Sequence, residues 1–204
     1  MIRNLKFLVA ATMAIAAFGA MGSAGAQAAE FHCSVSPCQV TMKPDGTGKT
    51  AHHVINVAGF QTTCGSITGE GTLTEKTSSE LTIGNLKGEN CVIIGQQSTL
   101  TSNGCHYLLK SAGTLTIKCP EGKVIENNGI NCNYDMPPQG PLPGVSFHTV
   151  GGGTEVTVEI KVKLTVSVYG VGCPTYGTEA EFVTANSLLT SETTGGVMAN
   201  LSWE

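Results

Sequence analysis

The side chains of this sequence that could carry out chemistry are few and stand apart from one another. Glu179 and Glu181 would alternate onto one face of a strand, roughly 6–7 Å apart, where two carboxylates could hydrolyse a sugar polymer. Two such carboxylates on an outward face are more commonly only solvated. His52 and His53 would point to opposite faces of a strand, so they cannot share one site without a bulge. We expect half-exposed strand histidines.

Two further motifs fall short of a catalytic or nucleotide-binding pattern. Residues 46–50, GTGKT, look like the end of a phosphate loop, but position 43 is Lys instead of Gly and no helical pattern follows. A Ser–His–Asp arrangement would have to use Asp45 or Asp135, which both lie in turn-like stretches, and there is no G-x-S-x-G motif. We therefore expect neither catalysis nor a cofactor.

Carbohydrate binding would need exposed aromatic side chains, and three residues are candidates for ligand contact. Tyr169 falls on the polar side of a long alternating segment, Tyr176 lies in the loop after it, and Trp203 is the penultimate residue. The alternative is that tyrosines lie at the rim of a β-core with only their hydroxyls in water.

Strands must position these residues. From 154 to 169 the chain alternates strictly between apolar and polar residues, which predicts a strand with one buried and one exposed face. The run would span roughly 43 Å, about twice a typical strand, so we expect it to bend or to serve two sheets in turn. If it lay at a sheet edge, it could pair with another chain.

The rest of the chain predicts short strands separated by turns, with no helical periodicity after the first 29 residues. Asn103-Gly104 and the segment 127–129, Asn-Asn-Gly, are hairpin signals. The fold class is therefore all-β, a disulfide-stapled antiparallel β-sandwich. The Pro-rich segment 136–144 predicts a stiff connection, or a sub-boundary between two β-lobes.

An even number of cysteines in an exported chain predicts disulfides, here four. There is no C-x₂-C pair and the histidines are not spaced as zinc ligands, so we expect no metal site. Eight cysteines allow 105 pairings, and we favour those that join neighbouring strands. On this ground we predict Cys119–Cys132 first and Cys91–Cys105 second, which leaves Cys64–Cys173 and Cys33–Cys38. A bridge from Cys33 or Cys38 to Cys64 is the alternative to the local pair.

Residues 1–29 have the pattern of a secretory signal peptide. Arg3 and Lys6 precede an apolar stretch over 7–20, and small residues with A-x-A cleavage choices follow. A membrane anchor is the alternative, but the apolar stretch is short for a span. We expect a domain over 30–204 that is secreted, either to the medium or to the cell envelope, and that contains no membrane span.

The charge of that domain excludes some partners. Nine Lys and no Arg remain against fifteen acidic residues, a net charge of −6. Such a surface is a poor partner for nucleic acid or anionic membrane, because phosphate recognition favours Arg.

Several segments together resemble a family of predicted secreted, cysteine-containing all-β proteins of unknown function from actinobacteria. They are FHCSVSPC, GSITGEGTL, Asn103-Gly104-Cys105, TIKCPEGK, VSFHTVG, EVTVEI, Gly172-Cys173-Pro174 and GVMANLSWE. The resemblance implies export and β-structure and transfers no functional residue.

The sequence thus favours a secreted or cell-surface protein that acts by binding or assembly, in a structural or adhesive role and without catalysis. Its partner would be a second copy of the chain, or a surface glycan or protein. A carbohydrate-binding module is the alternative. A small extracellular hydrolase using Glu179 or Glu181 is the third hypothesis.

Overall fold

Strands account for all the regular secondary structure in the part of the chain that a computed structural model describes, residues 29–45, 53–57, 60–173 and 179–204. The strands among these residues pair in antiparallel fashion. The predicted all-β fold and its antiparallel pairing are confirmed. No helix within the described ranges is long and apolar enough to cross a membrane.

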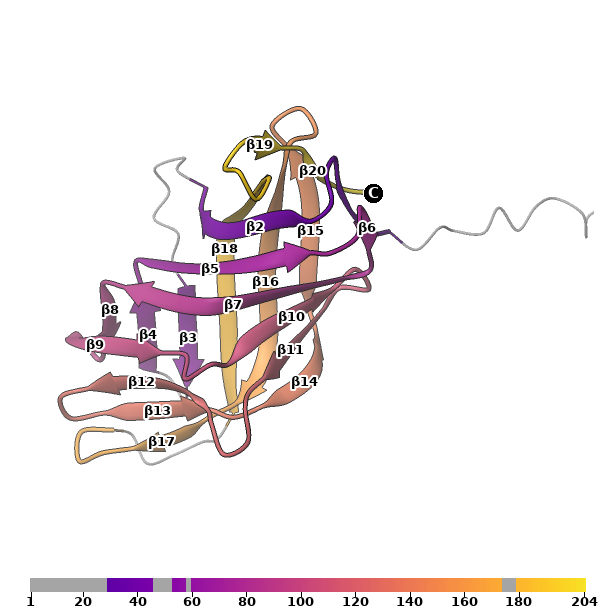
Figure 1. The fold of residues 1–204 in the computed structure, drawn as a ribbon. Coiled ribbons are helices and arrows are strands. Elements are labelled where there is room, and N and C mark those ends of the chain that lie inside the picture. The colour runs from indigo at the N-terminus through magenta and orange to yellow at the C-terminus, as the bar shows by residue number, and fades with distance from the viewer. Residues whose placement is uncertain (1–28, 46–52, 58–59, 174–178) are drawn as a thin grey trace, which may run out of the picture.

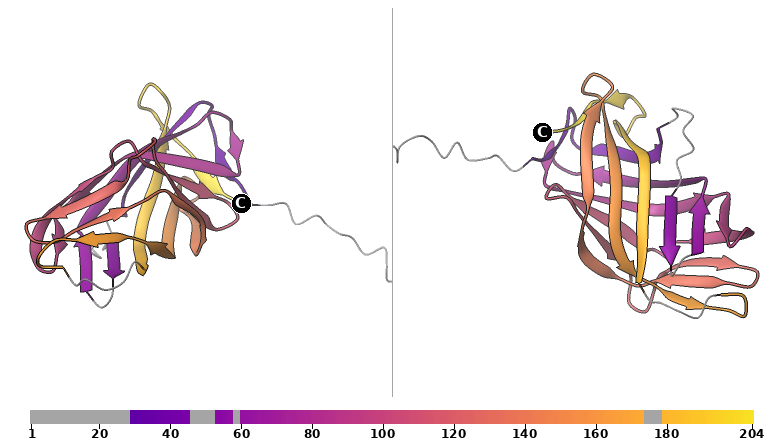
Figure 2. Two further views of the ribbon diagram at one scale, coloured as in Figure 1. Left: turned by 90° about the horizontal axis from the view of Figure 1, so that it is seen from below. Right: turned by 180° about the vertical axis from the view of Figure 1, so that it is seen from behind.

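The strands form two layers whose directions cross (Figures 1 and 2). The rear layer contains β3 (His53–Val57), β4 (Phe60–Cys64), β15 (Val145–Val150), β16 (Glu155–Thr165) and β18 (Glu179–Glu192). The front layer contains β2 (Cys38–Pro44), β5 (Ser66–Leu73), β7 (Glu80–Glu89), β9 (Gln96–Thr101), β10 (His106–Lys110), β11 (Thr114–Lys118), β12 (Ile125–Gly129), β13 (Asn133–Met136) and β17 (Ser167–Tyr169). The connecting strands are β8 (Cys91–Ile93), β14 (Gln139–Pro143) and β19 (Met198–Ala199). Crossed layers of this kind are joined at corners by strands that bend.

β18 makes one of these corners. Residues Ala180–Thr184 pair with β3 in the rear layer, whereas Ser187–Glu192 pair with β2 in the front layer. The register between β18 and β16 shifts between Val158 and Ile160, at the same level. An irregularity in the ladder lets one strand change neighbours, because it bends the strand and increases its local twist.

The alternating segment 154–169 forms two strands, in line with the expectation that it bends or serves two sheets. β16 ends at Thr165, Val166 intervenes, and β17 then pairs with β13. Apolar side chains of β16 are buried and the residues between them face outward, which confirms the period of two. The long strand does not lie at an open sheet edge, because β16 pairs with β15 on one side and with β18 on the other.

One hydrophobic cluster lies between the layers. It includes Val158 and Val162 from β16, Phe182 from β18 and Tyr107 from β10, and the rings of Tyr107 and Phe182 are 6.3 Å apart. Each fully buried side chain of this kind stabilises the fold by about 1.5–3 kcal/mol.

The Pro-rich segment contributes a strand to the sheet. Its β14 pairs with β11, with Leu115 opposite Leu142. Gly144 then joins β14 to β15, and its carbonyl accepts a hydrogen bond of 2.7 Å from the amide of Lys161. The segment therefore continues the sheet instead of making a bare connection.

The structure contains four disulfides, and three of the predicted pairings are wrong. Cys33–Cys38 is as predicted, and the other bonds are Cys64–Cys91, Cys105–Cys119 and Cys132–Cys173. Cys105 and Cys119 flank the hairpin of β10 and β11, in which His106 is opposite Lys118. Cys132 cannot meet Cys119 there, because its hairpin pairs with β9 and β17.

Hairpin signals were useful but not exact in position. Asn103 and Gly104 have φ of 51° and 80° and form the predicted turn. The segment 127–129 instead lies inside β12, and the turn follows it, between Gly129 and Asn133. The hairpin is thus present but displaced, because Asn127 is buried in the core.

A small second sheet closes one end of the molecule. Its strands are β1 (Phe31–Cys33), β6 (Thr77–Ser78) and β20 (Leu201–Trp203). The amide of Glu30 donates to the carbonyl of Glu204 at 2.6 Å, and the amide of Glu204 donates back at 3.1 Å. The two ends of the described chain are therefore fastened side by side.

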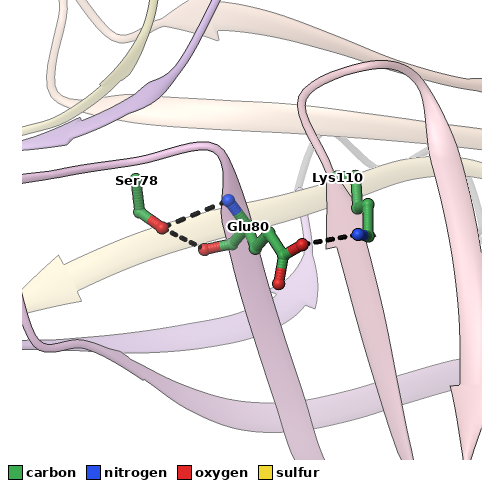
Figure 3. Close-up of polar contacts among 3 residues, drawn as sticks. All are labelled: Ser78, Glu80 and Lys110. Atoms are coloured by element: carbon green, nitrogen blue, oxygen red, sulfur yellow. Dashed lines mark hydrogen bonds and ion pairs between the residues drawn. The ribbon is translucent and has the colours of Figure 1, made fainter.

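Charged residues also fix the start of β7 (Figure 3). Glu80 lies opposite Lys110 of β10 and forms an ion pair with it at 2.5 Å. Ser78 accepts a hydrogen bond from the Glu80 amide and donates one to the Glu80 carbonyl. The hydrogen bond from Lys110 lowers the pKa of Glu80.

Candidate ligand-binding face

The predicted contact residues do not gather at one place. Tyr169 lies on β17, at the lower end of the front layer in Figure 1, whereas Trp203 lies on β20 near the opposite end. Trp203 is half-buried and packs on Phe147, with ring centroids 5.8 Å apart. It is thus part of the core margin, and not an open platform. Tyr176 lies outside the described residues.

The surroundings of Tyr169 form a continuous polar surface across four strands. Strand register places Thr99, Asn128, Asn133 and Tyr169 in one row across β9, β12, β13 and β17. The next row on the same side is Thr101, Glu126, Asp135 and Ser167. We call these eight residues the polar face. Side chains of alternate residues, such as Leu100 and Tyr134, point into the core instead.

Hydrogen bonds order the polar face. The Tyr169 hydroxyl donates to Oδ1 of Asp135 at 3.2 Å, and Nδ2 of Asn128 donates to Oε2 of Glu126 at 3.2 Å. Tyr169 nevertheless remains 44% exposed, and no other Phe, Tyr or Trp side chain among the described residues is exposed. The ring is therefore held by its hydroxyl while much of its surface stays accessible.

Two carboxylates face each other across strands on this surface, since Glu126 is directly opposite Asp135. Partial burial raises the pKa of Asp135, the hydrogen bond from Tyr169 opposes that shift, and the charge of Glu126 adds to it. Burial and the charge of Asp135 raise the pKa of Tyr169. The face is thus acidic, and it would repel anionic ligands.

A shallow open hollow adjoins the polar face. It has a volume of about 420 Å³ and is lined by Gln97, Ser98, Thr99, Asn128, Gly129 and Ile130. Four of these residues carry amide or hydroxyl side chains, Ile130 adds an aliphatic one, and none is charged. Such groups can hydrogen-bond the hydroxyls of a neutral ligand on either the donating or the accepting side.

A second cluster of polar groups lies beneath the face, inside the core. Nδ2 of Asn127 donates to the hydroxyl of Tyr134 at 2.9 Å, and His53 and Thr62 lie beside Tyr134 around a small cavity. The cavity leaves about 10 Å³ for the centre of a water molecule, so it is too small for any larger ligand. This cluster is therefore structural.

His53 was expected to be half-exposed, and that expectation is wrong. The residue is 4% exposed, and its ring stacks on Phe182 at 6.4 Å. Burial lowers the pKa of His53 to about 4. The imidazole is therefore neutral at physiological pH. His52 lies outside the described residues, as does the segment 46–50.

The carboxylates considered for hydrolysis are on another surface. Glu181 lies opposite Lys163 on the rear layer and forms an ion pair with Lys161 at 3.8 Å. Glu179 is opposite Thr165. Across residues 29–45, 53–57, 60–173 and 179–204, no three His, Cys, Asp or Glu side chains are grouped so that they could hold a metal ion.

Comparisons with protein-family models, with curated proteins and with solved structures give no match to this chain. What can be said of function therefore depends on the chemistry of the molecule itself.

Proposed function

We propose that this protein is exported and acts outside the cytoplasm as a binding protein, without catalysis. Four disulfides indicate an oxidising compartment, and residues 1–29 have the composition of a signal peptide. The alternative of assembly through the long strand has lost its support, because β16 is paired on both sides.

The polar face is the proposed binding surface, and neutral polysaccharide is the proposed ligand class. The observation that carries this proposal is Tyr169, an exposed ring held by Asp135 among amide and hydroxyl side chains. A sugar ring presents C–H groups that pack on an aromatic face and hydroxyls that need donors and acceptors. The acidic charge of the face disfavours nucleic acid and acidic glycans.

The test is retention of the exported, oxidised protein on an array of neutral and acidic polysaccharides. We expect retention on at least one neutral polymer and none on the acidic polymers. Retention only on acidic polymers, or on none, would contradict the proposal. Release of reducing ends that stops in a Glu181→Gln variant would favour the hydrolase hypothesis instead.

A further inference from the structure

Three neighbouring loop tips carry exposed aliphatic side chains at the end of the molecule where β8, β9, β12, β13 and β17 turn (Figure 1). Ile94 is 46% exposed, Ile130 80% and Val171 99%. We call these three residues the apolar tips. Ile94 lies in the turn between β8 and β9, Ile130 in the turn between β12 and β13, and Val171 follows β17.

Bonds between the loops hold the apolar tips in one group. Nδ2 of Asn131 donates to Oε1 of Gln96 at 3.4 Å, and the carbonyl of Asn131 accepts from the amide of Gly172 at 2.9 Å. The disulfide Cys132–Cys173 joins the second loop to the third. These contacts fix the positions of the three loops, so the exposure of the three side chains is a property of the folded structure.

Ile94 occupies a turn position whose backbone conformation is unfavourable for a β-branched residue. Ile94 and Gly95 have φ of 50° and 76°, the two positive values of a two-residue hairpin turn in which Asn-Gly is preferred. The other non-glycine residues with positive φ in the described chain are all Asn, at positions 85, 90 and 103. A β-branched residue with positive φ is unusual, and strain of this kind concentrates at functional sites.

Charge and area indicate what could cover the apolar tips. The segments 94–97, 129–131 and 170–172 contain no Lys, Arg, Asp or Glu, so burying them desolvates no charge. An aromatic side chain buries about 150–250 Å² and an aliphatic one less. Three aliphatic side chains therefore fall short of the ~800 Å² per partner in a stable protein interface.

We infer that the apolar tips insert into the interfacial region of an uncharged lipid bilayer. Small apolar groups on polar turns suit that region, where backbone groups remain hydrated while side chains reach the acyl boundary. Because no Lys or Arg is present at the tips, anionic lipid adds nothing and salt does not weaken the binding. Ile130 also lines the hollow beside the polar face, so the test below leaves Ile130 unchanged and alters only the other two tips.

The test measures co-flotation of the exported protein with phosphatidylcholine vesicles, after mass spectrometry has established its N-terminus. The double variant Ile94→Asn/Val171→Ser removes two apolar tips, and Asn at 94 suits the turn, so the variant should fold. The matched control is Val197→Ser/Met198→Ser, which removes two exposed apolar side chains (66% and 65%) outside the tips.

We expect the partition of the wild-type protein onto vesicles to fall by about tenfold or more in the tip variant and to stay unchanged in the control. Binding should be the same at low and high salt. No flotation of the wild type, or equal flotation of the tip variant and the wild type, would overturn the inference. So would a concentration-dependent dimer in sedimentation that the tip variant abolishes, since the occupant would then be a second copy.

The tip variant leaves the polar face intact, because Ile94 and Val171 do not line its hollow. It should therefore retain any polysaccharide binding. Loss of vesicle binding with retained polysaccharide binding separates the two proposals.

Discussion

The hydroxyl of Tyr169 donates a hydrogen bond to Oδ1 of Asp135, 3.2 Å away on the neighbouring strand. The two residues occupy adjacent rows of the polar face, so the bond runs diagonally across the ladder. It fixes the orientation of an exposed ring that would otherwise rotate freely, and it lowers the entropy that binding a ligand would cost.

Replacing Tyr169 should separate ring stacking from this hydrogen bond. We expect Tyr169→Ala to weaken binding to a retained polysaccharide by about tenfold or more, because an aromatic contact is removed. Tyr169→Phe should lose less, since it keeps the ring. Affinity electrophoresis would measure both variants, with Val197→Ala as a control outside the face. Unchanged binding of Tyr169→Ala would place the ligand elsewhere.

Replacing Asp135 tests the electrostatics of the face. Its raised pKa means that folding favours the protonated form, so the ionised carboxylate opposes folding at neutral pH. Asp135→Asn should therefore be more stable than the wild type at pH 7, and the advantage should shrink as pH falls through the titration of the carboxyl. Its amide oxygen can still accept the bond from Tyr169. Urea unfolding at several pH values measures the difference; a less stable variant at pH 7 would contradict the prediction.

His53 should make stability depend on pH. Its pKa in the folded protein is about 4, against 6.5 when unfolded. The unfolded chain therefore binds a proton first, and stability falls as pH drops from about 6.5 towards about 4, by about 3 kcal/mol in all.

Denaturant unfolding over that range is the measurement. His53→Leu should flatten the slope that His53 contributes, whereas His148→Gln, on an exposed position of β15, should retain it. If the two variants show the same slope, the buried imidazole is not its source.

The four disulfides should differ in their contribution to stability. Loop-closure entropy scales with the sequence separation of the paired cysteines, which is 5, 14, 27 and 41 residues. We expect removal of Cys33–Cys38 to cost about 2 kcal/mol and removal of Cys132–Cys173 about 4 kcal/mol. Double Cys→Ser variants and denaturant unfolding would measure the order, and peptide mapping would check the pairs.

Gly144 should tolerate no side chain. It has a φ of 117°, and a Cβ there would lie 2.1 Å from the carbonyl oxygen of Lys161. Gly144→Ala should therefore destabilise the fold by more than about 2 kcal/mol. Gly152, with a φ of 72° and open space around it, is the matched control, and its change to Ala should cost about 1 kcal/mol. Equal losses in thermal unfolding would show that the contact with Lys161 does not matter.

The period of the apolar residues predicted which face of a strand is buried, but it did not predict which strands pair with each other. The alternation from 154 to 169 was enough to find β16, its buried side and the bend before β17. It could not show that β18 pairs first with β3 and then with β2, because a period of two states which way a side chain points but not which strand lies alongside. The three wrong disulfide pairings have this same cause.

Part of the candidate site could be predicted from the sequence. The expectation of a half-exposed His53 overlooked that this residue shares its side of β3 with Ile55 and Val57, which are buried. Tyr169 was found because it falls on the polar side of an alternating run. The rows of the polar face join β9, β12, β13 and β17, which the sequence separates by as many as seventy residues, so only the fold could assemble them.

The paired backbones of Glu30 and Glu204 have a consequence for rearranging the gene. A short linker could join these two positions, because they already exchange hydrogen bonds. The chain could then be opened in the glycine-rich turn at 151–153, between β15 and β16, to give a circular permutant with the same sheets.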